Sequence, residues 1–155
     1  GGLREPNNLL NLGNSGTSTR LILGALASHP ITAFVSGDAS LRRRPMKRVI
    51  EPLSQIGARF ITREHGLLPL AIHGAIDPMP ITYTSPIASA QIKSAILLAG
   101  LNTPGITKVV EAQATRDHTE RMLRGFGRSI SLPLFKIQTR IECKTILLLG
   151  GMIPF

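Results

Sequence analysis

The sequence predicts an α/β fold made of two copies of a βαβαββ-like unit. Segments with apolar residues at helical spacing alternate with short apolar runs that are typical of strands. The stretch SGTSTRLILGAL also resembles SAQIKSAILLAGL, which lies about 73 residues further along the chain. In both places a helix, a strand, a basic loop and a second helix follow in the same order. This repetition favours helices packed on sheets.

The first unit is expected to hold two helices and three strands. The helices are predicted at residues 18–27 and 45–56, and the strands at residues 31–35, 58–62 and 68–73, with a turn at 64–66. Gly57 stands where a C-terminal helix cap is expected. Pro52 predicts a kink or an early break of the second helix, because proline lacks the N–H that a helical hydrogen bond needs.

The second unit repeats this pattern up to Gly127. Strands are predicted at residues 81–84 and 107–111, and helices at 89–99 and 118–126, with Ser89 as a suitable N-cap. After Gly127 the chain has a single acidic residue, Glu142, against four basic ones. Strands are indicated there at 136–141 and 145–149, but the repeat does not continue convincingly.

The composition excludes several classes of protein. The chain is 43% hydrophobic, yet no apolar run reaches the ~18 residues that a membrane-spanning helix needs. One cysteine, Cys143, excludes an internal disulfide and fits a reducing cytoplasm. The histidines are scattered singly, so a structural zinc site of the usual kind is not expected. The start has neither the layout of a signal peptide nor an initiator methionine, and we expect the natural N-terminus to be missing.

The net charge of +9 leaves three interpretations open. The chain could bind nucleic acid, bind anionic small molecules, or be the basic half of a larger, balanced protein. Nucleic-acid binders usually combine basic residues with aromatic ones for stacking, whereas aromatic residues make up only 4% of this chain. Anionic metabolites are therefore the favoured partners.

Two loops before predicted helices are candidates for holding an anion. The loop GNSGTSTR, residues 13–20, offers free backbone N–H groups at a helix start, although simple helix capping explains the same pattern. The loop GDASLRRRPM, residues 37–46, holds three arginines. Arg42 and Arg43 are expected in a solvated loop, while for Arg44 that interpretation and anion binding are evenly balanced.

Two further helix starts carry polar side chains. Ser89 and Gln91 supply a hydroxyl and an amide for hydroxyls or phosphate oxygens, and Ser89 can cap the helix at the same time. In the loop TRDH, residues 115–118, His118 is expected to be a surface residue and Asp117 a helix cap. These residues alone predict helix N-termini that are suited to binding an anion, and they do not identify a reaction.

Taken together, these stretches resemble the EPSP synthase family of enolpyruvyl transferases. The resemblance rests on GNSGTSTR, GDASLRRRPMKRVIEPLSQIGA, ITYTSPIASAQIKSAILLAGLNTPG and EAQATRDHTERMLRGFG, and covers roughly residues 3–127. It implies transfer of the enolpyruvyl group of phosphoenolpyruvate to the 5-hydroxyl of shikimate 3-phosphate with release of phosphate. This is a shikimate-pathway reaction that leads to chorismate and aromatic amino acids, and it requires no metal or organic cofactor.

The resemblance also implies a fold and a set of ligand contacts. The family fold has two similar domains, each with three βαβαββ units, and this chain would be an incomplete first domain. By motif, the phosphoenolpyruvate-binding residues would be Asn14, Gly16, Arg44 and Gln91, and the shikimate-3-phosphate-binding residues would be Ser89, Gln91 and Arg116. The family's catalytic Asp is expected in the missing second domain, so no catalytic residue is assigned and the chain alone is expected to be inactive. The full-length parent would be a cytoplasmic monomer without membrane partners.

Residues 128–155 do not resemble the continuation of the family. We therefore expect residues 1–127 to be part of the first domain and residues 128–155 to be a divergent tail, as a reading-frame change or a truncated gene would give. The related UDP-N-acetylglucosamine enolpyruvyl transferase is an alternative, but its catalytic Cys is absent from the loop at 37–45. A non-catalytic remnant of a decayed gene and a basic nucleic-acid-binding module also remain open.

Overall fold

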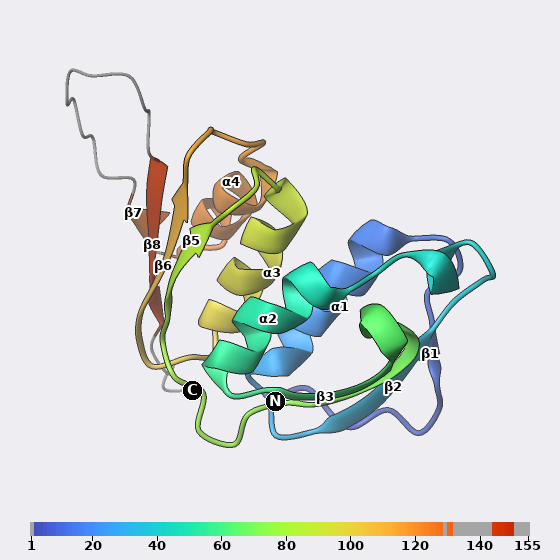
Figure 1. Cartoon of the computed structure of the whole chain (residues 1–155). Coiled ribbons are helices and arrows are strands. Elements are labelled where there is room, and N and C mark those ends of the chain that lie inside the picture. The colour runs from blue at the N-terminus through green and yellow to red at the C-terminus, as the bar shows by residue number, and fades with distance from the viewer. Residues whose placement is uncertain (1, 129, 132–143, 151–155) are drawn as a thin grey trace.

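The computed structural model describes residues 2–128, 130–131 and 144–150, which form two four-stranded sheets with helices between them (Figure 1). The first sheet has the order β1-β2-β4-β3 and the second has the order β5-β6-β8-β7. The first sheet's strands are β1 (Leu10–Asn11), β2 (Thr32–Ser36), β3 (Arg59–Arg63) and β4 (Leu67–His73). The second sheet's strands are β5 (Thr82–Ser85), β6 (Gly105–Glu111), β7 (Ile130–Ser131) and β8 (Lys144–Gly150).

The two sheets share one topology as well as one strand order. In each, the first two strands are parallel and the remaining neighbours are antiparallel. The described helices are α1 (Gly16–Ala27), α2 (Lys47–Ile56), α3 (Ala90–Gly100) and α4 (His118–Gly125), with short 3-10 helices at Leu41–Arg43 and Glu64–Gly66. The predicted duplication of a βαβαββ unit is therefore confirmed.

Helix α2 runs through Pro52, so the early break is wrong, while the alternative of a kink stays a prediction. The helix continues to Ile56 and ends at Gly57, whose φ of 116° is the left-handed conformation of a C-terminal cap. Val49, Leu53 and Ile56 are fully buried on one face of this helix. Their burial in the core outweighs the one hydrogen bond that proline removes from the helix.

The second unit continues beyond Gly127. Strand β8 contains the predicted strand at 145–149 and pairs with β6, as β4 pairs with β2 in the first unit. Ile130 of β7 is buried against Leu97 and Leu123. The predicted strand at 136–141 and Cys143 lie outside the described residues. The division of the chain at Gly127 stays a prediction.

Helix α3 lies in the centre of the molecule and joins the two units. Its Ala95 and Ala99 belong to the core cluster of the first sheet, and its Ile92 and Ile96 pack with the second sheet. Helices α1 and α3 touch at Gly24, where an added Cβ would lie 2.6 Å from Ala95 Cα. Only glycine allows so close an approach of the two backbones.

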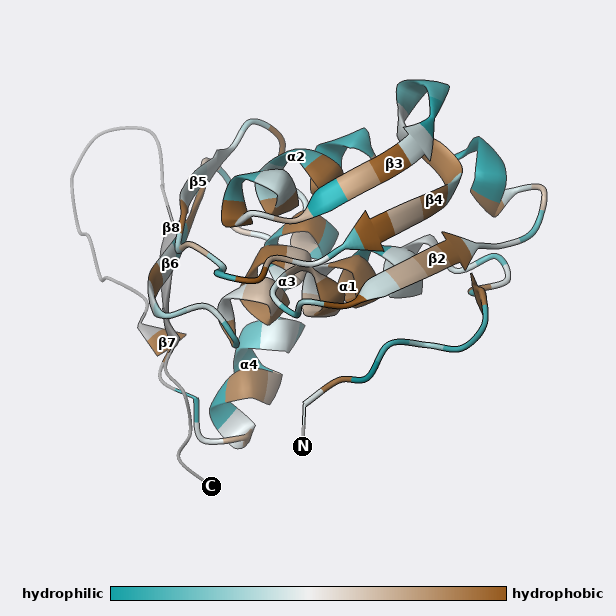
Figure 2. Cartoon of the chain, turned by 90° about the horizontal axis from the view of Figure 1, so that it is seen from below, coloured by the Kyte–Doolittle hydropathy of each residue, from teal (hydrophilic) through white to brown (hydrophobic). Residues whose placement is uncertain are grey.

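Among the described residues, the first sheet packs its helices on one face and leaves strand residues on its other face exposed. Seen from below, β2, β4 and β3 run side by side in front of the helices (Figure 2). Phe34 and Ile61 on these strands are largely exposed, while their neighbours Val35 and Ile72 are fully buried. No helix among the described residues is both long and apolar enough to cross a lipid bilayer. The first turns of α1 and α3 carry the polar residues considered next.

Candidate functional site

Two helix N-termini meet at one side of the molecule. Ser15 Oγ accepts a hydrogen bond from Ser18 N at 3.1 Å and caps α1, and Ser89 caps α3 in the same way. The capping role expected for Ser89 is therefore confirmed. Gln91 Nε2 donates to Thr17 Oγ1 at 2.9 Å, although the two residues lie 74 positions apart. This bond holds two positive helix-dipole ends beside each other, an arrangement that favours an anion.

Arg44 lies beside the start of α1, as its motif suggested. Its Nη2 donates to Asn14 Oδ1 at 2.6 Å and to Ser40 Oγ at 3.3 Å. A Cβ added to Gly16 would lie 3.3 Å from Arg44 Nη1 and 2.9 Å from Arg20 Nη1. The structure thus brings Asn14, Gly16 and Arg44 together around the first turn of α1.

Arg20 and Arg44 meet at Gly16, and the charge of Arg48 also acts on Arg20; we call these three residues the arginine cluster, of which only Arg44 was given a role from the sequence. Half-buried Arg20 donates from Nη1 to Gly16 O at 2.9 Å. Burial, together with the charges of Arg44 and Arg48, lowers the pKa of the Arg20 guanidinium. Arginine nevertheless stays protonated at neutral pH, so the like charges of these side chains repel one another. The sequence feature that could have identified Arg20 as a site residue is its position at the end of GNSGTSTR, one helical turn after Gly16.

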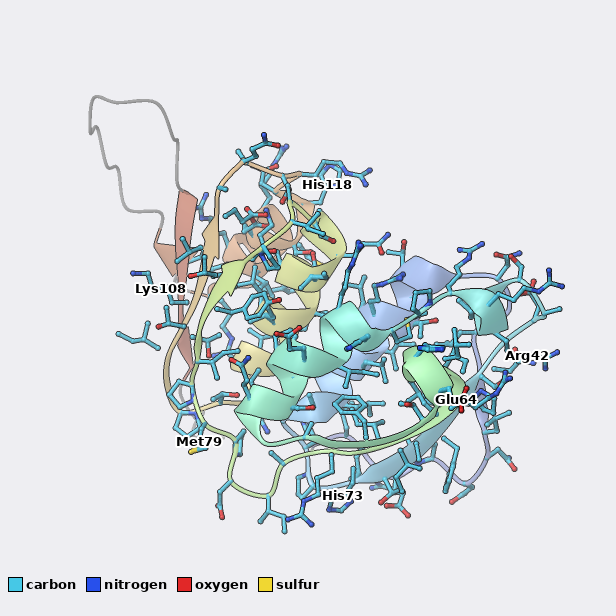
Figure 3. The ribbon with its side chains drawn as sticks, viewed as in Figure 1. Arg42, Glu64, His73, Met79, Lys108 and His118 are labelled. Carbon is cyan, nitrogen blue, oxygen red and sulfur yellow. The ribbon has the colours of Figure 1, made fainter. Side chains whose placement is uncertain are left out.

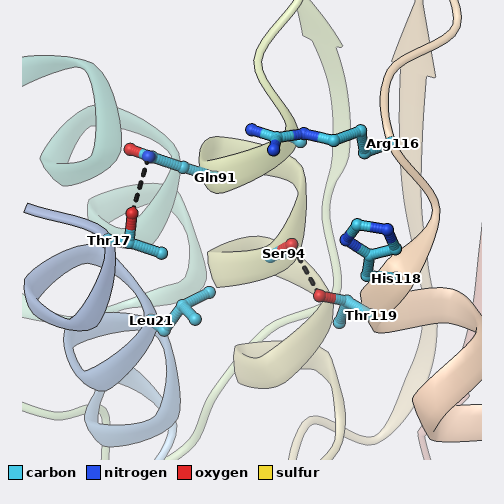
Figure 4. A pocket seen from close by; sticks show the side chains of 8 residues that line it. Thr17, Leu21, Gln91, Ser94, Arg116, His118 and Thr119 are labelled. Atoms are coloured by element: carbon cyan, nitrogen blue, oxygen red, sulfur yellow. Dashed lines mark hydrogen bonds between the residues drawn. The ribbon is translucent and has the colours of Figure 1, made fainter.

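A pocket of about 250 Å³ lies next to the arginine cluster, between α1, α3 and the start of α4 (Figure 4). Its lining residues are Thr17, Leu21, Ala90, Gln91, Ser94, Arg116, His118 and Thr119. Of the predicted ligand contacts, Gln91 and Arg116 line it. His118 is exposed, as expected of a surface residue, but it also faces the pocket.

Several pocket residues were not singled out from the sequence. Ser94 Oγ and Thr119 Oγ1 lie 2.7 Å apart in a hydrogen bond across the pocket floor (Figure 4). This bond and the one between Thr17 and Gln91 depend on how the helices pack, and no local motif predicts them. Asp117 is the N-cap residue of α4, but its side chain makes no capping hydrogen bond.

The other arginines of the RRR motif lie away from these groups. Arg42 points outward at the tip of the loop after β2 (Figure 3). Arg42 and Arg43 are exposed, in keeping with the solvated loop expected for both.

Replacing Gly16 with alanine should weaken anion binding while leaving the fold intact. The added methyl group meets the ends of two flexible arginine side chains, which can shift at little cost to stability. We expect roughly tenfold weaker binding, since misplacing a binding group by about 1 Å can cost up to ~100-fold. The binding constant for inorganic phosphate and the melting temperature are the measurements. Gly125→Ala is the matched control, because its methyl group would enter open space, and equal binding by the two variants would contradict the expectation.

Comparisons with a family model, with curated relatives and with solved structures all identify the same family. The family model described as EPSP synthase (3-phosphoshikimate 1-carboxyvinyltransferase) matches residues 1–145. The chain is 62% identical over 130 residues to the 3-phosphoshikimate 1-carboxyvinyltransferase of Paramagnetospirillum magneticum, and 61% identical over 132 residues to that of Parvibaculum lavamentivorans. These matches cover 84% and 85% of the chain, and 29% of each relative.

A solved structure agrees with these relatives. EPSP synthase from Acinetobacter baumannii matches 97% of the chain and 32% of that protein, with a TM-score of 0.87 and 44% identity. The chain therefore spans about three tenths of the length of the curated relatives it matches. The shared fold, the sequence identity and the family model together establish that the chain belongs to the EPSP synthase (3-phosphoshikimate 1-carboxyvinyltransferase) family.

Proposed function

We propose that this chain provides part of the substrate-binding surface for enolpyruvyl transfer. The reaction moves the enolpyruvyl group of phosphoenolpyruvate to the 5-hydroxyl of shikimate 3-phosphate and releases phosphate, on the pathway to chorismate. One observation carries the proposal: the arginine cluster at the start of α1 and the pocket that Arg116 lines are joined by the Gln91–Thr17 hydrogen bond. Two anionic ligands can thus bind side by side.

The arrangement suggests a position for each ligand. Phosphoenolpyruvate would bind at Asn14 and Gly16, with the guanidinium of Arg44 on its phosphate or carboxylate. Shikimate 3-phosphate would occupy the pocket, with Arg116 near its phosphate. Gln91 lies between the two positions and can reach both ligands, and Ser89 would contact shikimate 3-phosphate from the helix start.

Electrostatic stabilisation is the chemistry that these residues can supply. The transfer passes through a tetrahedral intermediate that crowds several negative charges together, and fixed cationic and N–H donors favour such a state. Among the described residues, no carboxylate lines the pocket. The carboxylate base for the proton transfers is assigned in this proposal to the part of the family fold that the chain does not cover, since the chain spans 29% of its relative. We expect the isolated chain to have negligible synthase activity.

A graft into a full-length relative tests this proposal. In the Paramagnetospirillum magneticum protein, the 130 aligned residues would be replaced by those of this chain; we call the product the grafted relative. We expect phosphate release that depends on both substrates, at a rate close to that of the parent relative, and none from the isolated chain.

Two results would overturn the proposal. One is a folded but inactive grafted relative, which would show that these residues no longer support the reaction, as in a decayed gene. The other is retention of the isolated chain on DNA that falls steeply with salt and is unaffected by shikimate 3-phosphate, which would favour a nucleic-acid-binding module. Substrate-dependent phosphate release by the isolated chain would contradict the expected inactivity.

A further inference from the structure

A buried ion cluster adjoins the pocket, since two of its members directly neighbour the lining residues Ser94 and Thr119 in the chain. Lys93 Nζ lies 3.1 Å from Glu111 Oε2 and 2.9 Å from Glu120 Oε1. All three side chains are at most 1% exposed. The cluster has one more acidic group than basic, and neither carboxylate oxygen of Glu120 has a hydrogen-bond partner among the described residues, although Oε1 is within ion-pair distance of Lys93. This cluster of Lys93, Glu111 and Glu120 is called the buried triad below.

Stability alone is a weak reason for such a triad. Removing charged groups from water costs free energy that their mutual attraction only partly returns, and apolar side chains of similar size often replace buried ion pairs without loss. The triad joins three elements: α3 through Lys93, the end of β6 through Glu111 and the first turn of α4 through Glu120. Its position therefore fixes the loop that runs from β6 to α4.

That loop is held by polar contacts at both of its ends. Thr115 Oγ1 donates to Glu111 Oε1 at 2.6 Å, and Thr119 is bonded to Ser94 at 2.7 Å. The loop residues 112–114 are exposed and so add little apolar anchoring. Arg116 lies between the two anchor points, is itself exposed, and makes no hydrogen bond or ion pair with the described residues. The place of Arg116 at the pocket is thus set by the backbone of the loop rather than by contacts of its own side chain.

We propose that the buried triad and Thr115 are positioning residues for Arg116, which they hold at the pocket so that its guanidinium meets an anionic group of the ligand. The identity of that ligand, shikimate 3-phosphate, rests on the proposed function. Lys93 acts through Glu111 and Thr115 on one side of Arg116, and through Glu120 on the other. Preorganisation of this kind raises affinity because the loop does not have to be ordered when the ligand binds.

Thr115→Val is the variant that tests the connection between triad and loop. It keeps the shape of the side chain and removes the hydroxyl that bonds to Glu111. Thr103→Val is the matched control, since Thr103 is buried, donates one hydrogen bond to Ala99 O at 2.9 Å and lies at the far end of α3. Calorimetric titration of the full chain with shikimate 3-phosphate and with shikimate separates phosphate recognition from the rest of binding. We expect Thr115→Val to weaken the binding of shikimate 3-phosphate by roughly tenfold and to leave the binding of shikimate unchanged. Thr103→Val should leave the binding of both ligands unchanged.

A double-mutant cycle with Arg116→Ala shows whether Thr115 acts through Arg116. If it does, Thr115→Val causes no further loss of shikimate 3-phosphate affinity once Arg116 is gone. Losses that multiply in the double variant would overturn the inference, as would equal losses for shikimate and shikimate 3-phosphate. A merely structural threonine would produce one of those two results.

Amide hydrogen exchange tests the inference without any ligand. Residues 112–118 should exchange faster in Thr115→Val than in Thr103→Val, and unchanged exchange would overturn the positioning role. If the unmodified chain does not bind shikimate 3-phosphate, the assignment of that ligand to the pocket fails, while the exchange measurement still decides whether the triad holds the loop. Lys93→Arg keeps the positive charge, so residues 112–118 should still exchange slowly in this variant. Fast exchange of these residues in Lys93→Arg would also count against the proposal.

Discussion

Replacing Arg44 with alanine is expected to raise the KM of the grafted relative for phosphoenolpyruvate by about 100-fold. The guanidinium can give an anion two charge-assisted hydrogen bonds, together worth roughly 3 kcal/mol. Asn14 Oδ1 and Ser40 Oγ already fix its orientation before a ligand binds. Arg44→Lys should lose most of the same affinity, because an ammonium group cannot reproduce the planar two-pronged contact.

The same loop contains the controls for this experiment. Arg42→Ala and Arg43→Ala remove equal charges from the same loop; all three arginines are exposed, but only Arg44 is hydrogen-bonded to Asn14 and Ser40. Both variants should keep the KM for phosphoenolpyruvate within about twofold, because neither side chain is held at the start of α1 and unheld exposed charges are largely screened by solvent and salt. Equal effects of all three substitutions would mean that the loop acts through its total charge, and would contradict a specific site at Arg44.

Replacing Lys93 with methionine is expected to lower the free energy of unfolding by about 3–5 kcal/mol. The substitution leaves Glu111 and Glu120 facing each other without a cation in a region closed to solvent. A loss of this size is a large part of the ~5–15 kcal/mol that stabilises a typical domain. Urea unfolding of the chain, followed by far-ultraviolet circular dichroism, measures it.

Glu120→Gln is the matched variant for the triad. It keeps the ion pair between Lys93 and Glu111 and removes the excess negative charge. We therefore expect the free energy of unfolding to fall by about 1 kcal/mol or less. A destabilisation as large as that of Lys93→Met would contradict this account, because it would mean that the volume packed there matters more than the charge balance.

Much of the fold was predictable because local signals and packing agree in it. The apolar spacing of α3 and its Ser89 cap both indicate a helix, and the structure confirms it. At Pro52 the local signal and packing conflict. A proline inside a helix predicts a kink or an early break, whereas burial of Leu53 and Ile56 keeps the helix continuous. Beyond Gly127 the sequence pattern is weak, and the continuation of the second unit is seen in the pairing of β8 with β6 and in the burial of Ile130 on β7.

The candidate site was predictable where a motif forms it and not where packing forms it. Arg44 belongs to a recognisable loop, and Gln91 and Arg116 to recognisable helix starts. Lys93 sits in a stretch of apolar and small residues, and a lysine there usually reaches solvent. Its burial depends on Glu111 and Glu120, which lie 18 and 27 positions away. No spacing rule for a single helix links such residues.

Helix α3 contributes to the core of a sheet that precedes it in the chain, and this has a consequence for synthesis on the ribosome. Ala95 and Ala99 complete the hydrophobic cluster that the first sheet forms with α1 and α2. The nascent first unit therefore keeps part of its apolar surface open until α3 has left the exit tunnel. Folding during translation is expected to occur in one late step that includes both units, rather than unit by unit as in many chains with repeated modules.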